Sequence, residues 1–463
     1  MKPEAGSPNP SISHPDALQK IMAEVVQNRL CTHCGTCVGL APDVLEMQLT
    51  DHGPVPAFLP GAGDASLETA YAACPGKGMD YPGLNEFVLG KSPSNWLVGC
   101  YRAFYIGYSN APAVRRQGAS AGVITQTLLY LLDSGRIDGA VVLRHGWPEP
   151  WLSAPVIART ADEILASSQS VYVPTPVNTL LEEMARFNGR LAYVGLPDQV
   201  ASLRTLQRLG HPGALKVDYV LGPYVGTMMY LSAIESYLRS NGFESLEDII
   251  ELRYRQGEWP GYLQIKTRSG RVLKADKFYY NYLIPFYITD STLMSVDFTN
   301  ELTDISVGDA WHPRYEGQGE GYSVVIARSE RAEGLLAEMQ AEGVVSLEET
   351  SVEDAMSMHG HMLDFKKRGA FIRLDWRRRF NPPVPDYGYR PVKAPIKRKL
   401  VEAVISSIFI ICRTRPARYI VERIPLSVIG PLFNNLRKSW KAISRPTKRK
   451  GLGETDYLVT KHS

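Results

Sequence analysis

This chain has few cysteines, no long apolar run and no pattern typical of a signal peptide. Its 463 residues include only six cysteines, too few for a scaffold held together by disulfides. The longest apolar candidate, residues 400–412, contains Glu402 and two serines and is shorter than the roughly 18 residues of a membrane-spanning helix. The N-terminus has neither the apolar stretch nor the cleavage site of a signal peptide. We therefore expect a cytoplasmic protein without a transmembrane helix.

The chain also has little net charge, but that charge is unevenly distributed. Its 51 lysines and arginines against 48 acidic residues leave +3, so the composition favours no nucleic-acid partner. Residues 391–450 hold 15 lysines and arginines and only Glu402 and Glu422, which gives this segment +13 and the rest of the chain −10. Such a basic segment points to a local anionic contact rather than to a basic protein.

Composition divides the chain into four parts. Residues 1–15 hold four prolines with Gly, Ser and Asn and are predicted to be a disordered tail. Residues 16–92 are rich in Gly and Pro and predict a small, loop-rich module. Strands alternate with helices in residues 93–390, and residues 391–463 form a basic amphipathic tail.

The pattern of the third part predicts an α/β fold with some α+β elements. Apolar strands near residues 103–109 and 138–144 flank a helical segment that Gly135 closes, and further β-α-β units follow. Repeated units of this kind favour a mostly parallel sheet with helices on both faces. After about residue 244 the pattern changes to hairpin-like strands with a Ser-Gly turn.

Four cysteines carry the strongest chemical signal. Cys31, Cys34 and Cys37 form a C-x2-C-x2-C motif, and Cys74 stands directly before Pro75. Three thiolates around one loop and a distant fourth are typical of a 4Fe-4S cluster in a ferredoxin-like module. A structural zinc site stays open as the alternative, although zinc more often uses two C-x2-C pairs.

A turn of small residues precedes the helix that begins near Val123. Gln117 begins this turn, and the missing or short side chains of Gly118, Ser120 and Gly122 let backbone amides approach a phosphate or a flavin ring. Close packing of the chain against itself would need the same residues. The turn alone does not decide between the two.

Five segments occur in the order and at about the spacing of one known family: RQGASAGVITQTLLYLLDSGRIDGAVV, SSQSVYVPTPVNTLLEEM, LAYVGLPDQVASLRTLQR, ELTDISVGDAW and GYSVVIARS. Across residues 93–345 the chain thus resembles the coenzyme F420 hydrogenase/dehydrogenase beta-subunit family, in which a ferredoxin-like module is a common companion. The resemblance implies an FAD-dependent oxidoreductase. Iron-sulfur clusters would exchange single electrons with the flavin, and the flavin would exchange a hydride with an organic partner.

The resemblance also implies which residues line the flavin site. The turn described above would wrap the FAD, and the loop SSQSVYVP would line the same cleft. We therefore expect cofactor contacts from Gln117, Gly118, Ser120, Gly122, Ser170, Tyr172, Gly195 and Asp309. For Asp309, hydrogen bonds within its own turn are the competing role.

The chain departs from the family at its cysteines. Where relatives commonly read G-x-P-C-Q, residues 195–199 read GLPDQ, and Pro223, Tyr224 and Ser295 stand where relatives tend to carry cysteines. The main domain therefore lacks the ligands of a second cluster. Asp198 becomes a candidate general acid, or else the N-cap of the helix that follows it.

We therefore predict an iron-sulfur flavoprotein that passes electrons between ferredoxin or deazaflavin coenzyme F420 and a small organic substrate, through one 4Fe-4S cluster and FAD. A non-catalytic electron-relay or scaffold subunit is the alternative.

The basic segment 393–450 combines apolar pieces with its positive charges, which favours an anionic membrane surface and a peripheral location at its inner face. A partner-protein contact or a solvated tail stays open. Its prolines at 416, 425 and 431 predict short helices.

Overall fold

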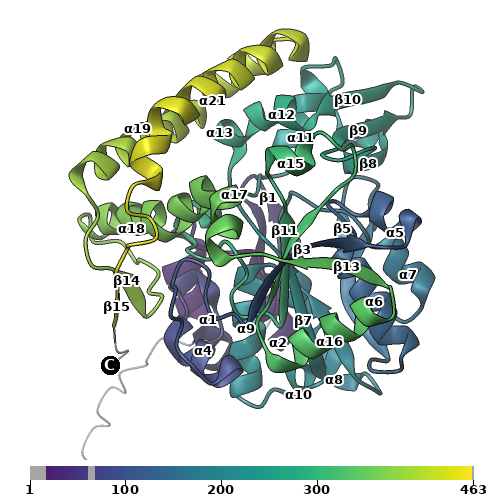
Figure 1. The fold of residues 1–463 in the computed structure, drawn as a ribbon. Coiled ribbons are helices and arrows are strands. Elements are labelled where there is room, and N and C mark those ends of the chain that lie inside the picture. Colours follow the sequence, from purple (N-terminus) through teal and green to yellow (C-terminus); the bar gives the residue numbers. More distant parts are fainter. Residues whose placement is uncertain (1–16, 61–67, 461–463) are drawn as a thin grey trace, which may run out of the picture.

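One eight-stranded sheet with helices on both faces forms the centre of the computed structural model, which describes residues 17–60 and 68–460 (Figure 1). The predicted disordered segment 1–15 lies outside the described residues. In sheet order the strands are β13 (Val345–Glu349), β3 (Ala103–Ser109), β12 (Ser323–Ala327), β11 (Ile305–Asp309), β7 (Val217–Pro223), β6 (Leu191–Val194), β4 (Gly139–His145) and β5 (Ser153–Ala158).

The sheet is mixed, so the predicted α/β class holds but the prediction of a mostly parallel sheet is wrong. Only the four inner strands β11, β7, β6 and β4 run parallel. The outer strands β5, β12, β3 and β13 each pair antiparallel with their neighbours. Residues 146–152 between β4 and β5 are too few for a parallel crossover, so these strands form a hairpin.

Helices cover both faces of the sheet because each has one apolar side. In α6 (Val123–Asp133) the buried residues Val123, Thr127 and Leu131 recur every four positions, and the helix is followed by Gly135 at φ 63°, as predicted. One face carries α6, α7 (Ala161–Ala166) and α16 (Glu330–Ala341). The other carries α8 (Leu181–Arg186), α9 (Pro197–Arg208) and α10 (Pro212–Leu215).

The N-terminal module packs directly on α9. Its elements are α1 (Ala17–Lys20), η1 (Ile21–Val26), α2 (Thr36–Leu40), β1 (Leu45–Thr50), β2 (Gly53–Phe58), α3 (Glu68–Ala72), η2 (Pro75–Lys77) and α4 (Tyr81–Leu89). The buried hydroxyls of Thr36 in α2 and Ser202 in α9 are 2.6 Å apart. Tyr81 and Leu84 of α4 belong to the same apolar cluster as α9. The domain boundary at 92/93 stays a prediction.

A second, antiparallel sheet stands over the carboxyl edge of the inner strands (Figure 1). It consists of β8 (Ile249–Gln256), β9 (Tyr262–Thr267) and β10 (Val272–Asp276), and the predicted Ser-Gly turn joins the last two. Helices α11 (Ser232–Arg239), α12 (Lys277–Tyr280), α13 (Ile284–Tyr287) and α14 (Asp290–Met294) lie around this edge.

The C-terminal part is helical and packed on the body. It runs through α17 (Val352–Asp364), η6 (Phe365–Gly369), α18 (Ala370–Arg378), α19 (Ile396–Cys412), α20 (Arg415–Val421) and α21 (Leu426–Arg449), with the short strands β14 (Tyr389–Pro391) and β15 (Tyr457–Val459). Pro431 does not break α21, contrary to prediction, because the carbonyl that loses its partner belongs to the exposed Ser427 and can be hydrated. Among the described residues no helix is long and apolar enough to cross a membrane.

A buried network of charges fixes α19 to the body. Arg398 of α19 contacts Asp364 at 2.8 Å and Glu402 at 2.9 Å. Arg373 pairs with Glu402, and Arg368 pairs with Asp364. All five side chains are at most 5% exposed. The predicted C-terminal tail is therefore a docked layer, at least through α19.

Replacing Arg398 by alanine tests this anchor. The change leaves Asp364 and Glu402 buried with one cation fewer, so we expect the free energy of unfolding to fall by about 3–5 kcal/mol. Urea unfolding followed by circular dichroism measures it. The matched control is Arg378→Ala, which removes an exposed pair with Asp375 and is expected to cost less than about 1 kcal/mol. Equal losses in both variants would contradict a buried anchor.

Candidate functional site

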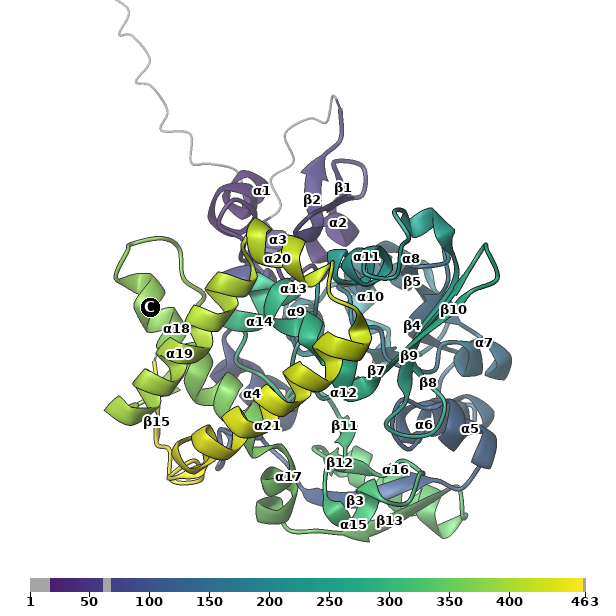
Figure 2. The same cartoon turned by 90° about the horizontal axis from the view of Figure 1, so that it is seen from above.

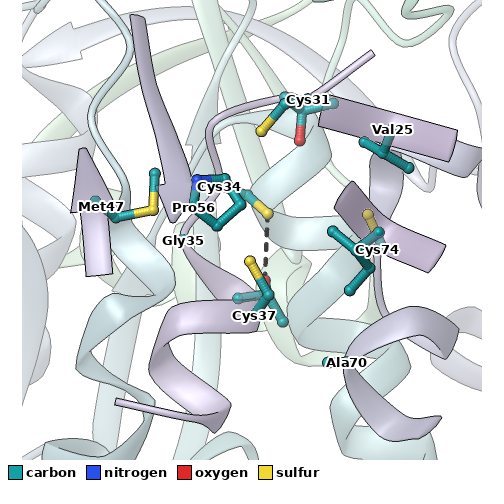
Figure 3. A pocket seen from close by; sticks show the side chains of 12 residues that line it. Val25, Cys31, Cys34, Gly35, Cys37, Met47, Pro56, Ala70 and Cys74 are labelled. Carbon is teal, nitrogen blue, oxygen red and sulfur yellow. Dashed lines mark hydrogen bonds between the residues drawn. The ribbon is translucent and has the colours of Figure 1, made fainter. Parts of the chain in front are cut away.

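The four predicted ligand cysteines line one cavity inside the N-terminal module. Figure 3 shows their side chains turned toward the same space, from the loop before α2, from α2 itself and from the residue before η2. None of them is in a disulfide. The rest of the lining is mostly apolar: Ile21, Val25, Thr32, Gly35, Thr36, Met47, Pro56 and Ala70.

The donor set fits an iron-sulfur cluster. Burial raises the pKa of all four thiols, to about 12 for Cys74, and neighbouring cysteines raise it further for Cys31, Cys37 and Cys74. Bound iron would offset this cost by holding them as thiolates. The His33 amide donates to Cys31 Sγ at 3.4 Å, a kind of contact that tunes cluster potentials.

No three His, Cys, Asp or Glu side chains in residues 17–60 and 68–460 are placed to hold a single metal ion. A cubane cluster, which contains its own sulfides, spaces its four cysteines more widely than one ion does.

Gly35 allows the cysteine loop to fold this way. Its φ of 84° lies in the left-handed region, and a Cβ there would come within 2.9 Å of Pro176. Only glycine adopts this conformation without strain and also lets the loop touch the main domain. The cysteine loop is thereby held against the segment before η3 (Val177–Leu180).

A second group of polar side chains, the edge cluster, lies at the carboxyl end of β11. It consists of Tyr172, Arg255, Trp259, Lys277 and Asp309. The Tyr172 hydroxyl accepts from Lys277 Nζ at 2.5 Å and from Arg255 at 3.0 Å. Asp309 accepts from Arg255 at 3.3 Å and from Trp259 Nε1 at 2.8 Å. In sheets with parallel strands this edge is where ligands bind.

The electrostatics of the edge cluster favour an anion. Burial alone would raise the pKa of Tyr172, but Arg255 and Lys277 outweigh it and lower the pKa to about 8. Burial and Arg255 also lower the pKa of Lys277. The pKa of Asp309 stays below its usual value, despite burial, because Arg255 and Trp259 contact it. Two cations thus face one carboxylate and one readily ionised phenol.

One atom of the edge cluster and one atom of the loop that leads to Tyr172 lack a protein partner in the described part of the chain. Arg255 Nε and Gln169 Oε1 are buried and have no hydrogen-bond partner among the described residues. Gln169 also has a φ of 94°, a strained conformation for a non-glycine residue, directly before the half-buried Ser170. Strain and buried unpaired groups are typical of ligand-binding sites.

The small-residue turn ends at the same sheet edge. Ser120 Oγ donates to the Tyr322 carbonyl at 3.0 Å and lies 2.9 Å from Ser323 Oγ, and Ser323 pairs in register with Asp309. A Cβ on Gly122 would come within 2.7 Å of the Val114 carbonyl. Chain packing alone therefore requires this glycine.

The remaining residues of that turn face the chain or the solvent. A Cβ on Gly118 would come within 2.7 Å of the Gly122 amide, so packing explains this glycine too. Gln117 is exposed.

Gly195 and Asp198 flank the start of α9. The Gly195 carbonyl, just after β6, accepts from Asn300 Nδ2 at 2.8 Å. Asp198 is not an N-cap, because α9 begins at Pro197 and its cap residue is Leu196. Burial raises the pKa of Asp198 to about 6 against the opposing charge of Lys366, so the carboxyl is a proton donor in mildly acidic solution.

A short chain of contacts joins the cysteines to the edge cluster. The His33 ring, within the cysteine loop, lies edge-on to Tyr230 at 6.2 Å between centroids. The next residue toward the N-terminus, Met229, donates its amide to the Tyr172 carbonyl at 2.9 Å. Tyr230 and Met229 thus connect the cysteine loop to the backbone of Tyr172.

Two family models match the chain, and both describe the beta subunit of coenzyme F420 hydrogenase/dehydrogenase. The model of its N-terminal part matches residues 104–182, and the model of its C-terminal part matches residues 188–353. Together they cover 245 of the 463 residues, which is more than half. The cysteine motif lies outside both matches.

Among the known proteins similar to this chain is the coenzyme F420-dependent sulfite reductase of Methanocaldococcus jannaschii, 25% identical over 340 residues that cover 70% of this chain and 48% of that protein. The beta subunit of coenzyme F420 hydrogenase from Methanothermobacter thermautotrophicus is 22% identical, over 62% of this chain and 99% of that protein. A solved chain of the F420-reducing NiFe hydrogenase complex from Methanosarcina barkeri has a TM-score of 0.49 and 20% identity, over 62% of this chain and 96% of that one.

Proposed function

Because this chain belongs to the coenzyme F420 hydrogenase/dehydrogenase beta-subunit family, we propose that it is an iron-sulfur flavoprotein oxidoreductase. Electrons pass between ferredoxin or coenzyme F420 and a small organic substrate, through one 4Fe-4S cluster and one FAD. The observation that carries the proposal is the set of four free thiols around one apolar cavity, joined by few residues to a cationic cluster at the sheet edge.

The two cofactors are assigned to separate residues. Cys31, Cys34, Cys37 and Cys74 hold the cluster. The flavin lies at the carboxyl edge, against the start of α6, the loop of Ser170 and the edge cluster, where Arg255 Nε and Gln169 Oε1 lack partners in the described chain. A cluster supplies single electrons, and a flavin links them to hydride chemistry.

The edge cluster has two tasks in this proposal. Arg255 and Lys277 stabilise negative charge near the ring of the cofactor, which favours its reduced form. Tyr172 holds a proton at its hydroxyl and donates it to the reduced substrate, and Lys277 then stabilises the phenolate that is left. Asp309 orients Arg255 through two hydrogen bonds.

The substrate itself does not follow from the relatives. The chain spans about half of the sulfite reductase that it resembles, but nearly all of the hydrogenase beta subunit. The name of the second relative supports coenzyme F420 as one electron partner. The organic partner is defined only as a small molecule that accepts or yields a hydride and a proton.

Anaerobic purification followed by metal, sulfide and flavin analysis tests the proposal. We expect about four irons, about four sulfides and one FAD per chain, and oxidation of reduced ferredoxin or reduced coenzyme F420. Four irons without flavin would instead identify an electron-relay subunit. The hydrogen bond from the Ser120 hydroxyl to the Tyr322 carbonyl favours this alternative, because it leaves that hydroxyl without need of a flavin partner. Zinc without flavin would refute both assignments.

A further inference from the structure

Helix α19 is apolar on its outer side as well as its inner side, where Val401, Ile405 and Phe409 pack in an apolar cluster. Among its inward residues, Arg398 and Glu402 are fully buried in the charge network. Its outward side is apolar, with exposed residues spaced three or four apart along one face: Ile396, Leu400, Val404, Ile408 and Ile411. A helix in contact with water normally exposes polar residues, so this outward apolar face is built for a non-aqueous neighbour.

Helix α21 also exposes a row of apolar residues on its outer side, and we call this row and the one on α19 the two apolar stripes. Its inner residues Ile429 and Phe433 pack on the apolar cluster around α13. Its outer side exposes Val428, Leu432, Leu436 and Ile443. Figures 1 and 2 show α19, α20 and α21 together as the outermost layer on one side of the molecule.

This layer exposes as many large apolar side chains as all the rest of the described surface. Of the 24 large exposed hydrophobic side chains among the described residues, 12 lie between Ile396 and Ile443. Single exposed apolar residues need no explanation, but aligned ones on adjacent helices do.

The charge around the stripes is of one sign. Between residues 393 and 450 every exposed charged side chain is a lysine or an arginine, since Glu402 is buried and Glu422 is half-buried in a pair with Arg239. Exposed cations stand beside the stripes at positions such as Lys399 and Lys438. A surface of apolar residues flanked only by cations complements an anionic lipid surface.

We propose that α19, α20 and α21 lie flat on a membrane of anionic phospholipid, with the two apolar stripes inserted at the level of the headgroups and the flanking cations on the phosphates. The charge network behind α19 keeps this face presented outward. The inference is independent of the proposed cofactors, because none of its residues belongs to the cysteine set or the edge cluster.

Flotation of the full-length protein with vesicles tests the proposal. We expect it to float with phosphatidylcholine vesicles that contain about a third phosphatidylglycerol, and much less with phosphatidylcholine alone. Replacing Lys399 and Lys438 by glutamine is expected to lower the partition coefficient by about fivefold per charge. High salt is expected to weaken binding in the same way.

The apolar part is tested with Leu400→Asp and Leu432→Asp, each expected to lower the partition coefficient about tenfold or more. Leu215→Asp is the matched control, because Leu215 is 58% exposed, close to the 63% and 51% of Leu400 and Leu432, but lies on α10. Unchanged circular dichroism establishes that each variant is folded.

Three results would overturn the proposal. The first is no flotation with anionic vesicles. The second is an equal loss of binding in Leu215→Asp and Leu400→Asp. The third is self-association that Leu400→Asp abolishes, without binding to vesicles, which would assign the face to a second copy of the chain.

Discussion

A Cys34→Ser variant is expected to lose its iron, from about four atoms per chain to fewer than about one, while its FAD stays bound. Cys34 is buried between Thr36 and the other three thiols, so a serine hydroxyl there offers a poor ligand in an apolar cavity. Turnover with a one-electron donor such as reduced ferredoxin is expected to fall by on the order of a thousandfold, because removing the cluster breaks the route to the flavin. Iron analysis and steady-state rates measure both effects.

Cys100→Ser is the control for the cysteine prediction. Cys100 is also free and buried, but its thiol donates to the Lys91 carbonyl at 3.3 Å, away from the cavity. We expect this variant to keep its iron and its activity. A Cys34→Ser protein that retained four irons would contradict the assignment of the ligands.

Tyr172→Phe is expected to lower turnover by about a hundredfold or more, because it removes the hydroxyl that donates the proton. Binding of FAD is expected to persist, since Arg255 and Asp309 remain. Steady-state rates and the flavin absorption spectrum separate the two effects. An unchanged rate would show that the proton comes from elsewhere, with Asp198 the next candidate.

The pH dependence of the same reaction has a definite sign. Tyr172 must be protonated to donate, so the rate of substrate reduction is expected to fall as the pH rises through the pKa of Tyr172, about 8. Lys277→Met removes a cation that stabilises the phenolate, which raises the pKa of Tyr172 and moves this fall to higher pH.

Tyrosinate absorbance offers a readout without turnover. Burial raises the pKa of the neighbouring Tyr254 and Tyr280, so Tyr172 is expected to ionise first. If the rate of Lys277→Met falls at the same pH as that of the unchanged protein, Tyr172 is not the proton donor.

The sequence predicted those features that are determined by residues close together along the chain. Cys31, Cys34 and Cys37 lie in one short stretch of chain, so their spacing alone predicted a shared site. The end of α6 was predicted from a single glycine, Gly135, which has a positive φ. The family resemblance was confirmed by the family models, and it pointed to Tyr172 and Asp309, which the structure places in one cluster.

The features that the sequence did not predict depend on contacts between segments that are distant along the chain. Arg255 and Lys277 lie on or next to strands of the second sheet, where alternating charged residues normally mean a solvated face, so no local signal marked them. Strand direction in the sheet depends on connections rather than on apolar periodicity. The burial of Arg398 and Glu402 in α19 was not predicted because their partners Asp364 and Arg373 belong to other helices.

The buried cations of η6 also constrain when the chain can complete its fold during synthesis. Arg368 donates to the backbone carbonyls of Lys448 and Lys450, which are 80 and 82 residues further along. The guanidinium cannot gain these acceptors until the ribosome has made residues 448–450. This contact forms only after α21 has been made, and a chain shortened before residue 448 would leave a buried charge with fewer acceptors rather than simply lose a tail.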